Sequence, residues 1–259
     1  MVNKNISLCF PEKSEKEVDV ITKEFFSHFC DIIVESIKLF NISEAEMQKR
    51  IPIVNREIFD EYYDKGKSLV VVTSHIANWE WAGTFLPNYG RHMAVGIYKP
   101  LTNKFFDELM VENRGRFGTH MIGTKKVKEF YEKHQDKLTF CGFIADQRPA
   151  DPAKGYWMKF LGRNTPVLLG SEIFAKKYDM PVVYAELIKI KRGYYKINLV
   201  KVCDEPRKSP EFEITRKHTE LLEDLIKRQP AYYLWTHNKW KHEHLGEEFM
   251  KKQAEKENQ

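Results

Sequence analysis

The sequence predicts an α/β fold: a single domain with a largely parallel, mixed β-sheet flanked by helices and preceded by a helical segment. Three observations predict it. Short apolar runs alternate with segments of helical period from residue 67 onward. The run SLVVVT, residues 68–73, has the composition of a strand buried on both faces, as in parallel sheets. A chain of 259 residues is also long enough to bury a sizeable core.

The N-terminal part, residues 1–66, is expected to form helices that pack on this core. Apolar side chains recur at helical spacing over residues 15–40. Ser43 and Glu46 resemble a capping box that opens a short helix. A further helix is predicted to end at Gly66.

The core is expected to span residues 67–245. Strands are predicted at residues 68–73, 93–98, around Met121, 138–145, 182–191 and 194–202, and helices at residues 79–88, 103–116, 125–135, 167–178 and 211–228. The last two strands flank Arg192 and Gly193 and are predicted to form a hairpin. Residues 146–165 are expected to be a long loop, and residues 246–259 a charged, frayed tail.

The composition of the chain restricts its function less than the sequence pattern restricts its fold. The net charge of +5 suits an anionic membrane surface, an acidic protein partner or phosphate groups, and is also common in proteins that bind none of these. The four cysteines have no CxxC spacing, so neither a disulfide framework nor a zinc site is predicted. No apolar stretch approaches the roughly 20 residues that span a bilayer. The beginning of the chain lacks the apolar region of a secretory signal.

The segment HIANWE, residues 75–80, carries the clearest chemical signal. His75 follows a buried strand, where open α/β sheets place their ligand sites. Residues five apart on one helix point about 140° away from each other, so His75 and Glu80 can meet only if the chain turns between them. A strand-to-helix turn would let Glu80 hold the imidazole, as the acid does in a hydrolase triad. The alternative is a histidine that caps the helix, with Glu80 favourable at its start.

HIANWE resembles the H-x4-D/E signature of lipid acyltransferases, and its flanks resemble the lipid A biosynthesis (late) acyltransferases. The resemblance runs from NISLCFPEKS to LWTHNKWK, where Asn238 replaces a usual arginine. It implies a glycerolipid-acyltransferase-like fold and transfer of an acyl chain from an acyl carrier protein to a hydroxyl of a lipid A precursor. It also implies a place at the cytoplasmic face of the bacterial inner membrane. Family members usually carry an apolar N-terminal segment, so this protein is expected to be peripheral or anchored by a segment absent from the chain.

Further blocks of the resemblance supply site residues. YKPLTN resembles the family's Y-x-P-x-x-N stretch, and NRGRFG its R-x-R element, whose first arginine is Arg114. A guanidinium can clamp a phosphate or stabilise an oxyanion, although the arginines could also be a solvated helix end. FIADQ places Asp146 after a buried strand, where it could pair with Arg114, fix the acceptor or hold a loop. The substrate-binding residues implied are Asn78, Tyr98, Lys99, Asn103, Arg116 and Gln147.

The predicted mechanism has His75 as the general base, Glu80 orienting it, and Arg114 offsetting negative charge on the intermediate. A thioester donor is already activated, so we expect no cofactor, no metal and no covalent enzyme intermediate. The predicted partners are acyl carrier protein, a membrane glycolipid acceptor and the inner membrane surface, with no nucleic acid. Three alternatives remain: an acyltransferase acting on another glycolipid, phospholipid or aminolipid, a thioester hydrolase, and a non-catalytic membrane-surface protein.

Overall fold

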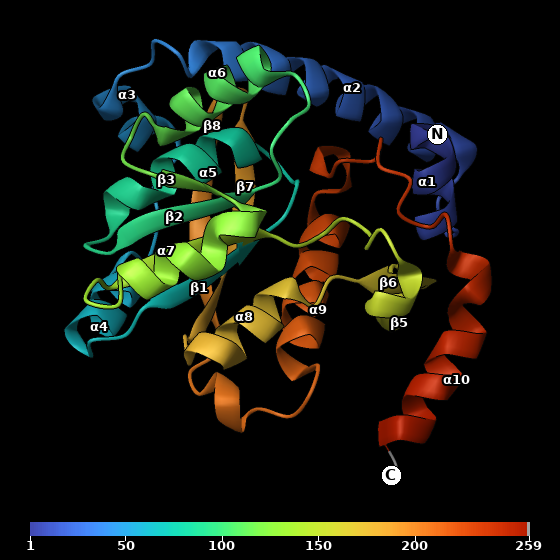
Figure 1. Cartoon of the computed structure of the whole chain (residues 1–259). Coiled ribbons are helices and arrows are strands. Elements are labelled where there is room, and N and C mark those ends of the chain that lie inside the picture. The colour runs from blue at the N-terminus through green and yellow to red at the C-terminus, as the bar shows by residue number, and fades with distance from the viewer. Residues whose placement is uncertain (258–259) are drawn as a thin grey trace.

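The structure is a computed structural model that describes residues 1–257, and in that part of the chain it contains a six-stranded sheet and a two-stranded one (Figure 1). The large sheet has the order β3-β2-β4-β1-β7-β8. Its strands are β1 (Leu69–Thr73), β2 (Met93–Tyr98), β3 (His120–Gly123), β4 (Thr139–Ile144), β7 (Val182–Lys191) and β8 (Tyr194–Cys203). Neighbouring strands are parallel except β7 and β8, which are antiparallel. The predicted α/β domain with a largely parallel, mixed sheet is confirmed.

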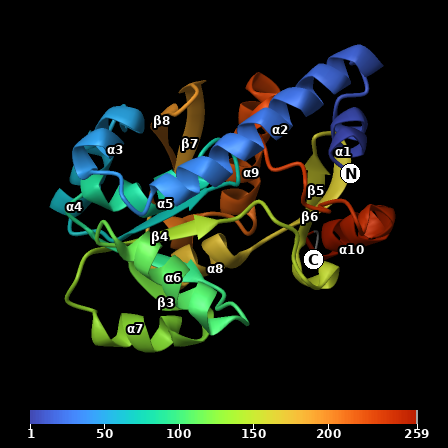
Figure 2. The same ribbon diagram turned by 90° about the horizontal axis from the view of Figure 1, so that it is seen from above.

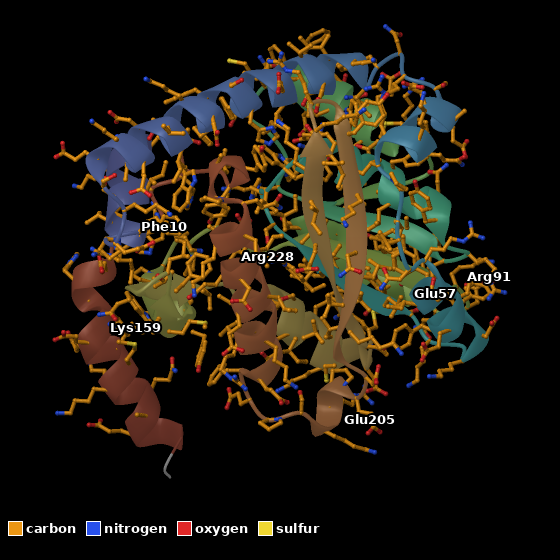
Figure 3. The ribbon with its side chains drawn as sticks, turned by 180° about the vertical axis from the view of Figure 1, so that it is seen from behind. Phe10, Glu57, Arg91, Lys159, Glu205 and Arg228 are labelled. Carbon is orange, nitrogen blue, oxygen red and sulfur yellow. The ribbon has the colours of Figure 1, made fainter. Side chains whose placement is uncertain are left out.

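The helices surround this sheet. They are α1 (Val2–Cys9), α2 (Glu15–Lys38), α3 (Glu44–Arg50), α4 (Glu57–Asp64), α5 (Trp79–Phe85), α6 (Lys104–Gly115), α7 (Val127–Lys133), α8 (Gly170–Tyr178), α9 (Glu213–Arg228) and α10 (Gly246–Glu257). Figures 1 and 2 show α2 lying across one side of the molecule. On the back of the molecule, Arg228 of α9 pairs with Glu186 of β7 and ties this helix to the sheet (Figure 3). No helix within residues 1–257 is both long enough and apolar enough to cross a bilayer.

Local sequence explains why α2 begins where it does. Ser14 Oγ accepts the N–H of Glu17, and the Glu17 carboxylate accepts the N–H of Ser14 at 2.8 Å, which forms a complete capping box. Ser43 Oγ likewise accepts the N–H of Glu46 at 3.3 Å, so this predicted cap at the start of α3 is present. One face of α2, including Val18 and Phe25, is buried against the rest of the domain. The capping box therefore sets where α2 begins, and its buried apolar face holds it against the domain.

Strand β1 lies at the centre of the parallel part of the sheet. All five of its residues are buried, as predicted for SLVVVT. Val71 is in register with Gly142 of β4 on one side and with Val183 of β7 on the other. The end of β1 therefore delivers the residues that follow it to the middle of the edge where parallel strands place their ligand sites.

The predicted loop at residues 146–165 is partly wrong. Its second half forms an antiparallel hairpin of β5 (Tyr156–Phe160) and β6 (Arg163–Val167), so the helix predicted from residue 167 begins only at Gly170. The two turn residues, Leu161 and Gly162, have φ of 50° and 73°. Tight hairpins favour positive φ at both turn positions, usually as Asn-Gly or Asp-Gly, and Leu-Gly lacks that signal.

The predicted frayed tail is also wrong, because residues 246–257 form the helix α10. The ring of Phe249 stacks on that of Trp157 in β5, with centroids 5.4 Å apart. The Gln253 side chain accepts the backbone N–H of Trp157 at 3.0 Å. Figure 1 shows α10 beside the β5–β6 hairpin. Gln253 also donates from its amide nitrogen to the Trp157 carbonyl at 3.3 Å, so an aromatic contact and a pair of hydrogen bonds help to dock a helix whose composition is mostly charged.

Candidate active site

His75 lies in the turn between β1 and α5. The turn contains Ala77 with φ of 50°, a left-handed conformation that costs a non-glycine residue about 1 kcal/mol. A segment near the C-terminus holds this turn in place: the N–H of Leu234 donates to the carbonyl of His75 at 3.0 Å, and the N–H of Ala77 donates to the carbonyl of Tyr232 at 2.9 Å. These two backbone hydrogen bonds join the strained turn to the C-terminal segment as they would join two antiparallel strands.

The carboxylate that holds His75 is Asp146, not Glu80 as predicted. His75 Nδ1 lies 2.7 Å from Asp146 Oδ1, and the Asp146 side chain is only 3% exposed. The parallel register explains the pairing. Thr73 of β1 is aligned with Ile144 of β4, and His75 and Asp146 each stand two residues beyond that aligned pair. Neighbouring parallel strands therefore carry the two side chains to the same point.

The surroundings keep Asp146 ionised. Burial raises the pKa of its carboxyl, but the charge and hydrogen bond of His75 and the charge of Lys239 outweigh this and hold that pKa below its usual value. The Lys239 ammonium donates to the backbone carbonyl of Asp146. Burial lowers the pKa of Lys239 to about 8, against the opposing influence of Asp146. Sequence reasoning missed Lys239, although it stands between Trp235 and Trp240 in LWTHNKWK, a sign of burial.

An ionised Asp146 fixes the tautomer of the neutral imidazole, because a carboxylate accepts the Nδ1–H proton. Nε2 is then the unprotonated nitrogen. Among residues 1–257, no protein group hydrogen-bonds to Nε2 of His75. The ring of Trp79 meets the imidazole edge-on, with centroids 5.5 Å apart. The arrangement is that of a general base whose basic nitrogen is left for a ligand.

Glu80 is paired with Arg114, so the predicted Arg114–Asp146 pair is also corrected. Arg114 donates from Nε to one Glu80 oxygen at 3.1 Å and from Nη2 to the other at 2.8 Å. This is a bidentate ion pair between the first turn of α5 and the last turn of α6. Both side chains are partly exposed, Arg114 at 33% and Glu80 at 17%. The pair leaves Nη1 of Arg114 as a donor for a ligand.

A cavity of about 270 Å³ opens beside these groups. Its polar lining includes His75, Glu80, Tyr98 and Arg114, together with the threonines at positions 73, 84 and 119. Its walls are mainly apolar and include Val71, Val95, Ile97, Phe140 and Leu187, with glycines at positions 83, 96 and 142. Such a cavity suits a ligand with one long apolar part and one reactive or charged end. No group of three His, Cys, Asp or Glu side chains in the described part of the chain is arranged to hold a metal ion.

Asn78 is turned into the core, which corrects its predicted place in the substrate site. Its Oδ1 accepts the N–H of Trp81 at 2.9 Å and caps α5. Its Nδ2 donates to the carboxylate of Glu35 in α2, which also accepts the hydroxyl of Tyr195 at 2.7 Å. Burial raises the pKa of Glu35, against the influence of the Tyr195 and Asn78 hydrogen bonds. Asn78 therefore links α2 to the turn between β1 and α5, which carries His75; we call this turn the catalytic turn.

Most of the other predicted substrate-binding residues also lie away from His75. Arg116 Nη1 donates to the carbonyl of Leu39 at the end of α2, away from the Glu80–Arg114 pair. Asn103 caps α6 by accepting the N–H of Phe106 at 3.3 Å. Lys99 lines a separate groove beside β3. Gln147 is half-buried next to Asp146. The structure therefore gathers His75, Glu80, Arg114, Asp146 and Tyr98, and leaves the rest at the margin.

An α/β sheet that presents a carboxylate-held histidine at the mouth of an apolar cavity fits the class of α/β enzymes that use a histidine as a base on an apolar ligand. Comparison with known families makes this more specific. Residues 1–242 match the family described as bacterial lipid A biosynthesis acyltransferase, and the chain belongs to that family. The family resemblance expected from HIANWE and LWTHNKWK is thus confirmed, and the protein is an acyltransferase of the lipid A biosynthesis type.

Several curated proteins are similar over most of the chain. A lipid A biosynthesis acyltransferase of Haemophilus influenzae is 21% identical over 252 residues, covering 93% of this chain and 76% of the relative. The lipid A biosynthesis palmitoleoyltransferase of Escherichia coli is 21% identical, covering 95% and 80%. Lipid A biosynthesis acyltransferase 2 of Shigella flexneri is 27% identical, covering 89% and 74%.

Proposed function

We propose that this protein transfers a fatty acyl chain from the thioester of an acyl carrier protein to a hydroxyl group of a lipid A precursor. The observation that carries the proposal is the His75–Asp146 pair at the mouth of the apolar cavity. If an acyl chain filled the cavity, its carbonyl group would lie at the cavity mouth, next to His75. The family supplies the acceptor class, since its members are named for lipid A biosynthesis.

In this mechanism, Nε2 of His75 removes the proton from the acceptor hydroxyl as that oxygen attacks the thioester carbonyl. The tetrahedral intermediate then collapses: the C–S bond breaks, and the imidazolium returns the proton to the leaving thiolate. Asp146 stabilises the imidazolium between these steps and keeps the ring oriented. A positioned general base of this kind contributes roughly 10² to 10⁴ in rate.

Glu80 and Arg114 act together on charge. Since Glu80 occupies Nε and Nη2, the guanidinium is held in one orientation with Nη1 directed elsewhere. We assign Arg114 to the oxyanion of the intermediate or to a phosphate of the acceptor, and Glu80 to positioning Arg114. Glu80, which the H-x4-E spacing had suggested as the partner of His75, thus serves the arginine instead.

The net charge of +5 suits both an acidic carrier protein and an anionic membrane surface. We place the protein at the cytoplasmic face of the inner membrane, where a glycolipid precursor and a soluble donor can meet. Relatives named palmitoleoyltransferase, lauroyltransferase and myristoyltransferase indicate that acyl length varies between members. In this chain, Gly83 lines the cavity with no atom within 4 Å of where its Cβ would stand, so a larger side chain there would take up cavity space.

The test uses purified protein, an acylated carrier protein and a lipid A precursor, with products read by mass spectrometry. The wild type should add one acyl chain, and His75→Ala should lose roughly 10²-fold or more of the rate. His120→Ala is the matched control, because His120 is an exposed histidine in β3. Release of free fatty acid at a rate comparable to transfer would identify a hydrolase instead. Acylation of a phospholipid but not of the precursor would move the acceptor to another class.

A further inference from the structure

The outward side of α2 changes character halfway along the helix. Up to Glu24 it exposes mainly charged residues, among them Lys16, Asp19, Lys23 and Glu24, together with the apolar Val20. From Phe26 onward it exposes large apolar side chains, and the turn that follows the helix adds one more. We call these five residues the apolar face of α2: Phe26 (49% exposed), Ile33 (51%), Val34 (65%), Ile37 (66%) and Phe40 (37%). Their spacing places them along one side of the helix, and Figure 2 shows α2 lying over the molecule on the viewer's side.

The opposite side of the same helix holds the catalytic turn. His28 is buried, and its Nε2 lies 3.2 Å from the carbonyl of Ala77. Glu35 accepts a hydrogen bond from Asn78, and the indole N–H of Trp81 donates to the backbone carbonyl of Glu35 at 2.9 Å. A helix with its side chains is about 10–12 Å across. The His75 turn therefore lies about one helix diameter beneath the apolar face.

Cations flank the C-terminal part of the apolar face, whereas the exposed carboxylate of Glu24 lies near Phe26 at the other end. The carboxylates in the second half of α2 are Asp31 and Glu35; Glu35 is buried, and Asp31 is paired with Arg192 at 2.7 Å and with Lys189 at 3.5 Å. The Arg192 side chain is 73% exposed. Lys38 is exposed at the end of the helix, where Arg116 also binds the Leu39 carbonyl. An apolar strip with a cationic rim complements an anionic bilayer surface.

We infer that the apolar face of α2 inserts into the headgroup region of an anionic bilayer, with the helix lying in the membrane plane. The inference rests on the proposed function in one respect, because that function requires a bilayer lipid as acceptor. It adds the surface that docks and the orientation that follows: the His75 turn is held just below the lipid surface.

The experiment measures sedimentation of the purified chain with vesicles of phosphatidylcholine containing phosphatidylglycerol. The face variant is Ile33→Ser/Ile37→Ser, and the control is Ile173→Ser/Ile190→Ser, which removes two isoleucines exposed at 61% and 57% from α8 and β7. The wild type and the control should bind equally, and the face variant should bind roughly ten-fold less or worse. Vesicles of phosphatidylcholine alone should bind the wild type more weakly.

Circular dichroism checks that both variants fold, and the single change Val34→Ser provides a milder second variant at a site 65% exposed. Failure of the wild type to bind vesicles, or equal binding by the face variant, would overturn the inference. Concentration-dependent dimers in the wild type that the face variant abolishes would show that a second copy covers the strip. Vesicle binding is measured without donor or acceptor. An absence of acyl transfer would therefore count against the proposed function and leave the docking surface standing.

Discussion

Two carboxylates lie near the cavity mouth, and their surroundings give them different tasks. Asp146 is buried and bound to Nδ1 of His75, and its interactions with His75 and Lys239 hold the pKa of its carboxyl below the usual value, against the effect of burial. Glu80 is partly exposed and forms both of its hydrogen bonds with Arg114. We therefore expect Asp146 to act through His75, the proposed general base, and Glu80 to act through Arg114, the proposed partner of negative charge.

Substituting each carboxylate by its amide separates these tasks. Asp146→Asn should lower kcat by roughly 10² to 10⁴, because the imidazolium formed during transfer loses its stabilising charge. Glu80→Gln should lower kcat less, because Glu80 acts through Arg114 and is not bonded to His75. Both rates are measured with the acylated carrier protein as donor. A greater loss in Glu80→Gln than in Asp146→Asn would return the orienting role to Glu80.

The two arginines of the R-x-R element provide a second comparison at this scale. Arg114→Lys should be severely impaired despite its retained charge, because an ammonium cannot form the two parallel bonds that Glu80 accepts. Arg116→Lys should stay close to the wild-type rate, since Arg116 donates to a backbone carbonyl that a lysine can also reach. Steady-state transfer rates of the two variants decide the matter. Greater damage at Arg116 would mean that the functional arginine has been wrongly assigned.

Among the elements, α10 and the β5–β6 hairpin depend on each other. The helix begins at Gly246, and a Cβ atom there would lie only 2.3 Å from Cβ of Asn164 in β6. The start of the helix can approach the hairpin this closely only because residue 246 has no side chain. The stacked rings of Phe249 and Trp157 then extend the contact along the helix.

Gly246→Ala should therefore loosen α10 and lower the free energy of unfolding by about 1–3 kcal/mol. The matched control is Gly170→Ala at the start of α8, where an added Cβ meets nothing within 4 Å. That change should be neutral or stabilise the protein by up to about 1 kcal/mol, through the lower entropy of the unfolded chain. Urea unfolding of the three proteins measures both effects. Equal stability of Gly246→Ala and wild type would show that α10 can be displaced without loss.

The same scale explains which features the sequence could predict. The β-branched run at residues 68–73 and the 3.6-residue period of residues 15–40 are local signals, and both elements formed as expected. The carboxylate that pairs with His75 depends on which strand lies beside β1 and in what register. The spacing of residues near His75 in the sequence indicates neither the neighbouring strand nor the register. The hairpin turn at Leu161 and Gly162 was missed because a leucine adopts positive φ there against its usual preference.

For the molecule as a whole, two buried histidines make stability depend on pH. Burial, reinforced by the charge of Lys189, lowers the pKa of His28 to about 4. Burial and then the charge of Lys239, opposed by that of Glu172, lower the pKa of His218 to about 4. In the unfolded chain both would titrate near 6.5. Between those values the unfolded state binds more protons, so stability is lost as pH falls from about 6.5 to about 4.

Each histidine should contribute up to about 3 kcal/mol of this loss. His28→Gln retains a donor for the Ala77 carbonyl and an acceptor for Lys189 but cannot titrate. The free energy of unfolding of this variant should therefore fall less steeply than that of the wild type between about pH 7 and about pH 5. The difference in slope should approach the value for one bound proton. Urea titrations at several pH values give the two slopes. Identical slopes would show that His28 is not the group being protonated.

The pairing of the catalytic turn with the C-terminal segment has a consequence for the order of synthesis. Leu234 and Lys239 donate to the carbonyls of His75 and Asp146, and Asn5 of α1 donates to the carbonyl of Trp235. Translation delivers Asn5 first and Lys239 more than two hundred residues later. A nascent chain that already contains β1 and β4 still lacks the groups that close the turn. We therefore expect a growing chain to hold His75 and Asp146 in their folded geometry only after residues 234–239 have been synthesised.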